Sequence, residues 1–235
     1  MTRVVGSDGG VADGRDTRSR LLTAAEELFA DRGSDAVSLR EIGRAAGARN
    51  VIAAQYWFTD RDGLVQALLD RHAPEVEQHR HRMLDAFRDG PHADAVVGGP
   101  GADDAVHELA AALVEPLAVK LDQGAAGAGY LRTVADLLTR PVPSMAPLAL
   151  DQPGGSIGRW RELLEPLLEP EAVELHRRFL TVRFVAVEMA QRARAGRDDH
   201  RLFVSQLVDA AAGLLGSRVS ARTRELRAER RGGAS

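Results

Sequence analysis

Apolar residues recur at helical spacing through most of the chain. The first predicted helix runs from about Asp16 to Asp31, because its apolar residues lie three and four positions apart: Leu21, Leu22, Ala25, Leu28 and Phe29. Gly33 is a natural stop for this helix. Residues 1–14 lack such periodicity, and their Gly, Asp and Ser content predicts a disordered leader.

A second, short helix has a clear start signal. Ser38 and Glu41 have the spacing of a reciprocal capping box, and Val37 and Ile42 can form a hydrophobic staple around it. The pattern ends after about two turns at Ala46–Gly47. The second helix is therefore expected over residues 38–46.

A third helix is predicted from about Asn50 to Phe58, and Thr59 and Asp60 end it. Asp60 also caps a fourth helix, which carries Asp62 in its first turn, where the helix dipole favours an anion. Two short helices joined by a tight, Gly-containing turn beneath a longer helix have the layout of a helix-turn-helix. Residues 38–63 are thus predicted to form its DNA-reading half.

Pro74 lies inside the fourth helical pattern and predicts a kink or a junction there. Loops are expected at 90–102 and 141–158, and Gly124–Gly129 should separate two of the later helices. These later helices are predicted at 103–122, 126–140, 159–168, 171–195 and 199–216. The tail, 217–235, has six arginines against two glutamates and is expected to fray rather than to make a second DNA contact.

Composition favours an all-α protein. Ala and Leu supply most of a 44% hydrophobic content, whereas aromatic residues make up only 4%. The absence of cysteine excludes disulfides and thiolate metal sites, and no apolar run approaches the roughly 20 residues of a membrane span. A cytoplasmic location is therefore expected. The net charge of −3 does not exclude DNA binding, because a DNA reader needs a basic face rather than a basic total.

Residues 17–69 resemble the N-terminal domain of the TetR family of transcription regulators. The matching pattern comprises Leu21-Leu22-x-Ala24-Ala25-x-x-Leu28-Phe29 with Gly33, then Ser38-Leu39-Arg40-x-Ile42, Ala45-Ala46-Gly47, and Tyr56-Trp57-Phe58-x-x-Arg61-Asp62-x-Leu64. These residues agree in order, in spacing and in predicted helix placement. The rest of the chain matches only in helical character.

The resemblance implies a small DNA-binding domain, here residues 15–62, and a larger helical domain for effector binding and dimerisation, here 63–216. The chain looks similar to the subset with Arg-Asn followed by Gln-Tyr-His-Phe. It departs from the family in three places: the stretch from Gly47 to Phe58 is one residue longer than usual, Gln55 stands where many members have tyrosine, and Trp57 replaces histidine or tyrosine. Individual base contacts are therefore not carried over.

Nine residues are the candidate DNA contacts. Polar types suited to guanine and adenine edges, and an alanine suited to a thymine methyl, stand on the third helix, whereas hydroxyl, aromatic and cationic groups that can hold phosphates flank it. They are Ser38, Arg40, Arg49, Asn50, Ala53, Gln55, Tyr56, Trp57 and Arg61. Arg61 stands where the family usually has lysine and retains the charge. Trp57 could equally be packed in the core.

Other residues of the same segment are better explained without DNA. Apolar residues on the inner helix faces are expected in the core, namely Ile42, Ala46, Ala54 and Phe58. Arg32 and Arg44 are expected on the solvated surface.

The effector site is less defined. The candidate pocket residues are mostly apolar, and each could instead be ordinary core: Met83, Phe87, Leu113, Leu117, Tyr130, Val134, Leu137, Trp160, Arg183 and Phe184. The scarcity of polar residues on the inner faces favours an apolar effector. Arg183 could pair with an anionic group, with Glu188 or with a partner subunit.

The sequence thus predicts a ligand-responsive homodimeric regulator, joined through helices 171–195 and 199–216 and bound to a near-palindromic duplex. Repression relieved by ligand is the family's common polarity, and activation is the alternative. Two other functions remain open: a small-ligand-binding protein with a vestigial helix-turn-helix, and a protein-interaction module. No catalytic constellation, cofactor motif or metal site is predicted, since His79 and His81 are two positions apart and lie on different helix faces.

Overall fold

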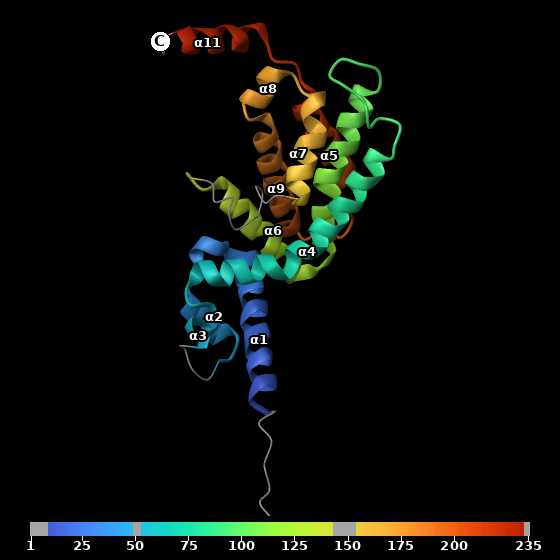
Figure 1. The fold of residues 1–235 in the computed structure, drawn as a ribbon. Helices are drawn as coiled ribbons and strands as arrows, with labels where there is room; N and C mark the ends of the chain where they lie inside the picture. Colours follow the sequence, from blue (N-terminus) through green and yellow to red (C-terminus); the bar gives the residue numbers. More distant parts are fainter. Residues whose placement is uncertain (1–8, 49–52, 143–153, 233–235) are drawn as a thin grey trace, which may run out of the picture. The chain divides into compact units, whose positions relative to one another are not determined.

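The computed structural model describes residues 9–48, 53–142 and 154–232, and every regular element in these ranges is helical (Figure 1). The all-α prediction is confirmed. The elements are α1 Gly9–Arg32, η1 Ser34–Ala36, α2 Leu39–Ala45, α3 Ala53–Phe58, α4 Arg61–Arg88, α5 Ala102–Ala118, η2 Val119–Asp122, α6 Gly124–Thr139, α7 Ser156–Leu164, η4 Glu165–Leu167, α8 Pro170–Glu174, α9 Arg177–Arg194, α10 Arg201–Gly216 and α11 Ala221–Gly232.

The chain divides into two compact units, and one boundary between them falls inside the sequence of α4. The first unit contains residues 1–74, 120–148 and 190–196, and the second contains 75–119, 149–189 and 197–235. Helix α4 continues through Pro74, so the predicted junction lies at this proline without a break in the helix. The first unit extends beyond the predicted boundary at residue 62, because it also includes η2 from Lys120 onward and α6.

Glycines allow α6 to pack closely on α1 and on η2 in the first unit. A Cβ atom on Gly129 would lie 2.4 Å from the carbonyl oxygen of Glu26 in α1, and one on Gly127 would lie 1.9 Å from that of Lys120. These glycines were expected to form a spacer between two helices. They instead lie inside α6, because close backbone approach needs residues without a side chain.

The core of the second unit forms around α5, which packs against α7 and α10. Trp160 of α7 is fully buried and donates its indole N–H to the carbonyl of Leu109 at 2.7 Å. Arg80 of α4 is also buried, and it donates to the carbonyl of Ala112 and to the hydroxyl of Ser156. No sequence pattern predicted a buried cation at this position.

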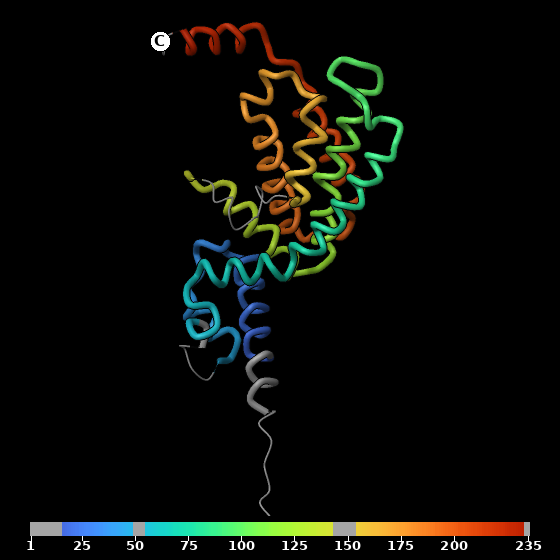
Figure 2. Tube along the Cα trace, in the orientation of Figure 1, coloured from blue at the N-terminus to red at the C-terminus, as the bar shows by residue number. Residues whose placement is uncertain are grey.

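Two helix boundaries differ from their predictions. Helix α1 begins at Gly9 rather than near Asp16, since no proline interrupts the segment and each added residue extends the hydrogen-bonded ladder. The long helix predicted over 171–195 is divided into α8 and α9 by His176, whose φ of 55° is left-handed and cannot continue a helix. The tube in Figure 2 follows the chain through this break.

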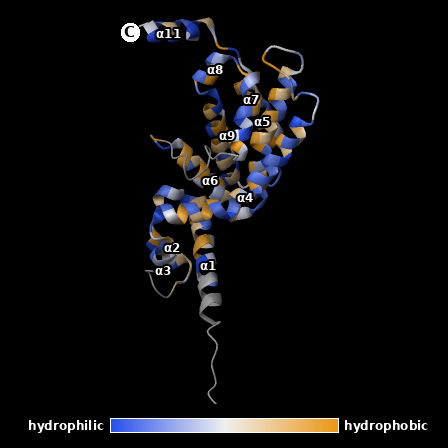
Figure 3. Ribbon diagram, viewed as in Figure 1, coloured by the Kyte–Doolittle hydropathy of each residue, from blue (hydrophilic) through white to orange (hydrophobic). Residues whose placement is uncertain are grey.

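The C-terminal segment is helical over α11, although the sequence predicted a frayed tail. Ser220 is an N-cap that the sequence pattern had not indicated, since its hydroxyl accepts from the backbone N–H of Thr223. Arg224 and Arg227 pair with Glu169 and Glu174 of the α8 segment, which adds support outside the helix itself. Figure 3 shows that α11 is predominantly hydrophilic, and it contains no buried residue.

Among the described residues, no single helix is both long and apolar enough to cross a membrane. The bent pair α10–α11 meets that test by length and composition only when the two helices are taken together.

Candidate nucleic-acid interface

Helix α2 begins with the predicted capping box. The Ser38 hydroxyl accepts from the Glu41 N–H at 3.3 Å, and the Glu41 carboxylate accepts from the Ser38 N–H at 2.9 Å and from the Ser38 hydroxyl at 2.8 Å. Val37 and Ile42, the predicted staple, are both buried. The Ser38 hydroxyl, a candidate phosphate donor, is thus already engaged in capping the helix.

These hydrogen bonds also affect the acidity of Glu41. The Ser38 N–H and hydroxyl, together with Arg32, lower the pKa of Glu41 from 4.5 to about 2. Because the folded pKa lies below the unfolded one, the carboxylate stabilises the fold above about pH 4.5, and this contribution is lost as the pH falls toward 2.

Replacing Ser38 with alanine is expected to lower the free energy of unfolding by about 0.5–2 kcal/mol, since one N–H of the first turn of α2 loses its acceptor. Urea titration followed by circular dichroism measures this change. Ser38→Thr, which keeps the accepting hydroxyl, is the control and should change stability by less than about 0.5 kcal/mol. An equal loss in both variants would contradict the role of the cap.

The turn after α2 is held by its own backbone and by α1. The Ala48 N–H donates to Gly43 and the Gly47 N–H donates to Arg44, which is the Schellman pattern. Gly47 has a left-handed φ of 62°, as this motif requires. Arg20 of α1 donates to the carbonyls of Ala46 and Gly47 at 2.6 and 3.2 Å. The turn is therefore fixed against α1.

Helix α3 exposes polar and aromatic side chains on one side and buries an anchor on the other. Gln55 is exposed, Tyr56 is 80% exposed, and Trp57 is half-buried with its ring edge-on to Tyr56. Phe58 is buried, as predicted, and the Arg18 guanidinium lies 5.5 Å from its ring centre. The exposed pair can reach a ligand outside the domain without disturbing the core.

The structure describes only some of the remaining candidate DNA contacts. Arg49 and Asn50 lie outside the described residues, as do the side chains of Ala53 and of Ala54, although α3 begins at Ala53. Arg40 is exposed in the first turn of α2.

Three further residues of this segment can be compared with their predictions. Ala46 was expected in the core but is only half-buried, because it is the C-cap residue at the end of α2. Arg32 and Arg44 are exposed, as predicted. Arg32 donates to the capping carboxylate of Glu41 at 2.9 Å.

The start of α4 follows a tight bend after α3. Thr59 has a φ of 59°, and the Asp60 carboxylate accepts from the Gly63 N–H at 2.8 Å, which confirms the predicted cap. A Cβ atom at Gly63 would lie 2.2 Å from the carbonyl oxygen of Phe58, so a glycine is needed where α4 meets the end of α3. This bend places Arg61 at the first position of α4.

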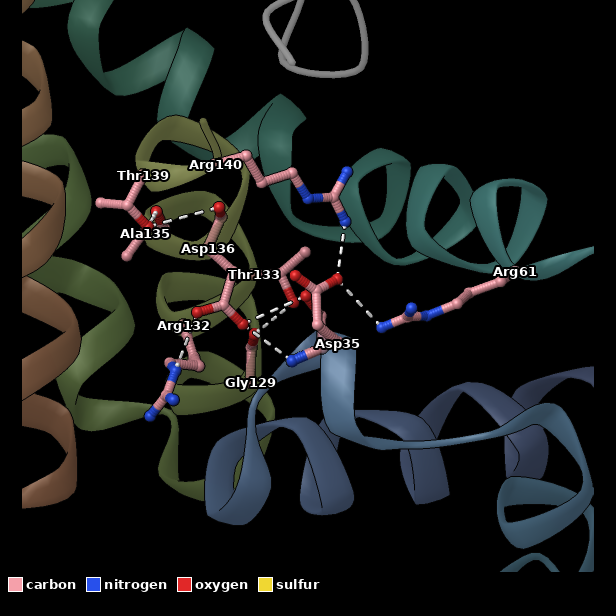
Figure 4. Close-up of polar contacts among 10 residues, drawn as sticks. Asp35, Arg61, Gly129, Arg132, Thr133, Ala135, Asp136, Thr139 and Arg140 are labelled. Atoms are coloured by element: carbon pink, nitrogen blue, oxygen red, sulfur yellow. Dashed lines mark hydrogen bonds and ion pairs between the residues drawn. The ribbon is translucent and has the colours of Figure 1, made fainter. Parts of the chain in front are cut away.

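The guanidinium group of Arg61 is paired with a carboxylate of the same chain. Its Nη2 donates to Oδ1 of Asp35 at 3.2 Å, and the same oxygen accepts from Nη2 of Arg140 at 2.8 Å, as Figure 4 shows. The hydrogen bond from Arg140 is the largest of several effects that lower the pKa of Asp35 below 3.8, and the bond from Arg61 acts in the same direction. Asp35 thus joins the start of α4 to the end of α6.

A second carboxylate ties the same turn to α6. Asp136 accepts from the backbone N–H of Ser34 at 2.8 Å, from the Ser34 hydroxyl at 3.1 Å and from Nε of Arg132 at 3.0 Å. Ser34 is fully buried. The η1 turn, which leads from α1 into α2, is therefore fastened to α6 on both sides.

A mostly buried ionic network joins α1 to α4. Glu26 of α1 accepts from Arg71 at 3.0 Å and from Nε2 of His72 at 3.0 Å, both on α4. Nζ of Lys120 lies 3.4 Å from Nδ1 of His72 and donates to Gln123 at 3.2 Å. Since an ammonium group only donates, Nδ1 of His72 accepts and Nε2 carries the proton.

The candidate effector residues are distributed over both units. In the second unit Phe87, Leu113, Leu117 and Trp160 are buried, whereas Met83 and Phe184 are partly buried. In the first unit Tyr130, Val134 and Leu137 of α6 are buried. Arg183 is exposed, and its guanidinium lies 5.9 Å from the ring centre of Phe179.

Sequence reasoning missed the residues that connect the helix-turn-helix to α6. Asp35, Asp136 and Arg140 carry no motif, because they meet only when helices distant in sequence pack together. The buried network around Glu26 did carry a signal in the sequence: Lys120 is the single lysine among 31 basic residues.

Comparison with known proteins finds a family match for the N-terminal part of the chain. Residues 21–68 match the family model of bacterial regulatory proteins of the tetR family. No curated protein matches the chain.

Similar solved structures cover most of the chain. A HlyIIR mutant with an alanine-substituted segment is 14% identical and covers 92% of this chain and 100% of its own, with a TM-score of 0.52. A TetR-family regulator from Streptomyces coelicolor A3 is 17% identical, with 92% and 100% coverage and a TM-score of 0.42. A tetR-family regulatory protein from Rhodococcus RHA1 is 16% identical, with 86% and 98% coverage and a TM-score of 0.44.

The likeness to the first of these structures concerns the fold alone, and the family match concerns the helix-turn-helix. Residues 21–68 are therefore similar to the DNA-binding part of bacterial regulatory proteins of the tetR family, and the fold of the chain is similar to that of the HlyIIR mutant.

Proposed function

We propose that this protein is a homodimeric, cytoplasmic repressor that a small, mainly apolar effector releases from a near-palindromic operator. The observation that carries the DNA-binding part is the arrangement of α2 and α3. A doubly capped helix and a fixed turn hold α3 so that Gln55 and Tyr56 are exposed, with Arg40 exposed in the first turn of α2. Rigid presentation of such side chains suits recognition in the major groove.

The proposed contacts divide into two groups. Gln55, with Arg49, Asn50 and Ala53 of the preceding segment, would read base edges. Groups around them would hold the phosphates, namely Ser38, Arg40, Tyr56, Trp57 and Arg61. The structure adds that Ser38 would have to share its capping hydroxyl and that Arg61 would have to leave or share Asp35.

Dimerisation through α9 and α10 is supported by apolar side chains that the single chain leaves exposed. Leu202 of α10 is 77% exposed and Leu180 of α9 is 44% exposed. Burying such residues against a second copy would join two reading heads about a two-fold axis. The operator half-sites would then lie about one helical turn apart.

An apolar effector is supported by the residues around the core of the second unit. Phe87, Leu113 and Leu117 are buried, and the N–H of Trp160 is already hydrogen-bonded to the backbone. A ligand seated among such side chains would act mainly through apolar contact. Repression is proposed as the polarity because it is the common one among proteins that this chain resembles.

DNA binding should be steeply salt-dependent. Full-length protein is used to select duplexes from a random pool, and its affinity for the selected duplex is measured by fluorescence anisotropy. Affinity is expected to fall about tenfold or more over a threefold rise in salt, because phosphate contacts release counterions. Affinity that is absent or independent of salt would contradict the proposal.

Two substitutions separate the predicted roles on that duplex. Gln55→Ala should relax base preference at one position, whereas Arg61→Ala should weaken all sequences alike and reduce the salt slope by about one. The reverse pattern would show that the roles are exchanged. If no duplex is retained at all, the chain is better explained as a ligand-binding protein with a vestigial helix-turn-helix.

A further inference from the structure

Asp35 gives Arg61 an anion within its own chain. The Asp35 side chain is 57% exposed, and its Oδ1 accepts from Arg61, which is 35% exposed, and from Arg140, which is 29% exposed (Figure 4). One oxygen thus receives two guanidinium groups, at 3.2 and 2.8 Å. All three residues belong to the first unit.

A carboxylate and a phosphate present similar oxygens to a guanidinium, so Asp35 occupies Arg61 in the way that a DNA phosphate would. The ion pair leaves Arg61 incompletely satisfied. Among the residues that the structure describes, Nε of Arg61 is buried without a hydrogen-bond partner. Because an unpaired buried donor carries a free-energy penalty, a ligand that engages both Nε and Nη2 could replace Asp35.

Arg140 and Arg61 share the Oδ1 atom of Asp35, so the bond from Arg140 affects how strongly Asp35 holds Arg61. It caps the C-terminal end of α6, and its bond to Oδ1 is the shorter of the two. While Arg140 is in place, Asp35 shares its charge between two cations. If the end of α6 moves away, Asp35 interacts with Arg61 alone and holds it more strongly.

We propose that Asp35 competes with DNA phosphate for Arg61, and that Arg140 weakens this competition while α6 stays in place. The inference rests on the proposed function, since it assumes that Arg61 binds DNA. It adds a direction to regulation: a displacement of α6 lowers DNA affinity by returning Arg61 to Asp35. The helix-turn-helix itself need not unfold or change shape.

The test compares variants of the full-length protein on the duplex that the wild type selects. Asp35→Asn should bind about twofold to fivefold more tightly per reading head, which is the range of an exposed ion pair. Arg140→Gln should bind more weakly by a similar factor. The double variant should behave like Asp35→Asn, because Arg140 acts only through the carboxylate.

Asp62→Asn is the matched control. It removes the same charge from an exposed position in the first turn of α4, next to Arg61 in sequence. Any gain common to Asp35→Asn and Asp62→Asn reports net charge alone. In an Arg61→Gln background the additional gain of Asp35→Asn should disappear, whereas the gain of Asp62→Asn should persist.

The outcomes separate the two proposals. If the wild type binds no duplex, the proposed function fails. If the wild type binds but Asp35→Asn gains no more than Asp62→Asn, or keeps its gain without Arg61, competition by Asp35 is refuted. Tighter binding by Arg140→Gln would overturn the role of α6. Thermal unfolding of each variant shows whether an altered affinity reflects a loss of folded protein.

Discussion

Glu26→Ala is expected to lower the free energy of unfolding by about 3–5 kcal/mol, because it leaves buried donors without their carboxylate. Glu26 is 2% exposed, and its partner His72 is 6% exposed. Without the carboxylate, the N–H of His72 loses its acceptor and the cation of Lys120 remains buried nearby. Urea unfolding measures the loss, and Glu27→Ala, one position along α1 and exposed, should change stability by less than about 0.5 kcal/mol.

The same network predicts a dependence of stability on pH. Burial raises the pKa of Glu26, but hydrogen bonds from His72 and Arg71 outweigh burial, so the pKa lies below its ordinary value of 4.5. The ionised carboxylate therefore stabilises the fold fully above about pH 4.5, and this stability is lost as the pH falls below it. Glu26→Gln should abolish that part of the pH dependence. An unchanged profile would mean that other carboxylates carry it.

Gly129→Ala is the second substitution with a large expected effect. The new Cβ would lie 2.4 Å from the oxygen, 2.8 Å from the Cα atom and 2.9 Å from the carbonyl carbon of Glu26, all of them backbone atoms of α1. Because backbone cannot rotate away like a side chain, α1 and α6 must separate. The expected loss is about 1–3 kcal/mol, or more where the helices cannot move.

The matched control is the same substitution where space is open. Gly232 is the last residue of α11, and a Cβ there meets no atom within 4 Å. Gly232→Ala should change stability by less than about 0.5 kcal/mol. Thermal unfolding compares the two variants. If both behave alike, the close approach of α1 and α6 does not exist in solution.

The sequence predicted the local features of the fold well. The capping box of Ser38 and Glu41, the stop at Gly47 and the cap at Asp60 depend on residues within five positions of one another. Such signals are complete in a short segment of sequence, which is why the helix-turn-helix could be recognised.

The features that the sequence did not predict depend on residues far apart in the chain. Gly129 was interpreted as part of a spacer because its neighbour on α1, Glu26, is about a hundred residues away in the sequence. Asp35 carries no sequence signal for its ion pair with Arg140, and the arginines of α11 gave no indication of the glutamates in α8. The candidate site was therefore predicted as a set of exposed groups, without the Asp35 carboxylate that pairs with Arg61.

The single lysine has a consequence for the chemistry of the folded protein. Lys120 is 1% exposed, and the other thirty basic side chains are arginines. Reagents that acylate primary amines, and proteases that cut only after lysine, thus find no accessible side chain while the first unit stays closed. Acylation of the Lys120 side chain, as distinct from the α-amino group, accordingly reports the opening of one specific interior, next to His72 of α4, rather than general surface exposure.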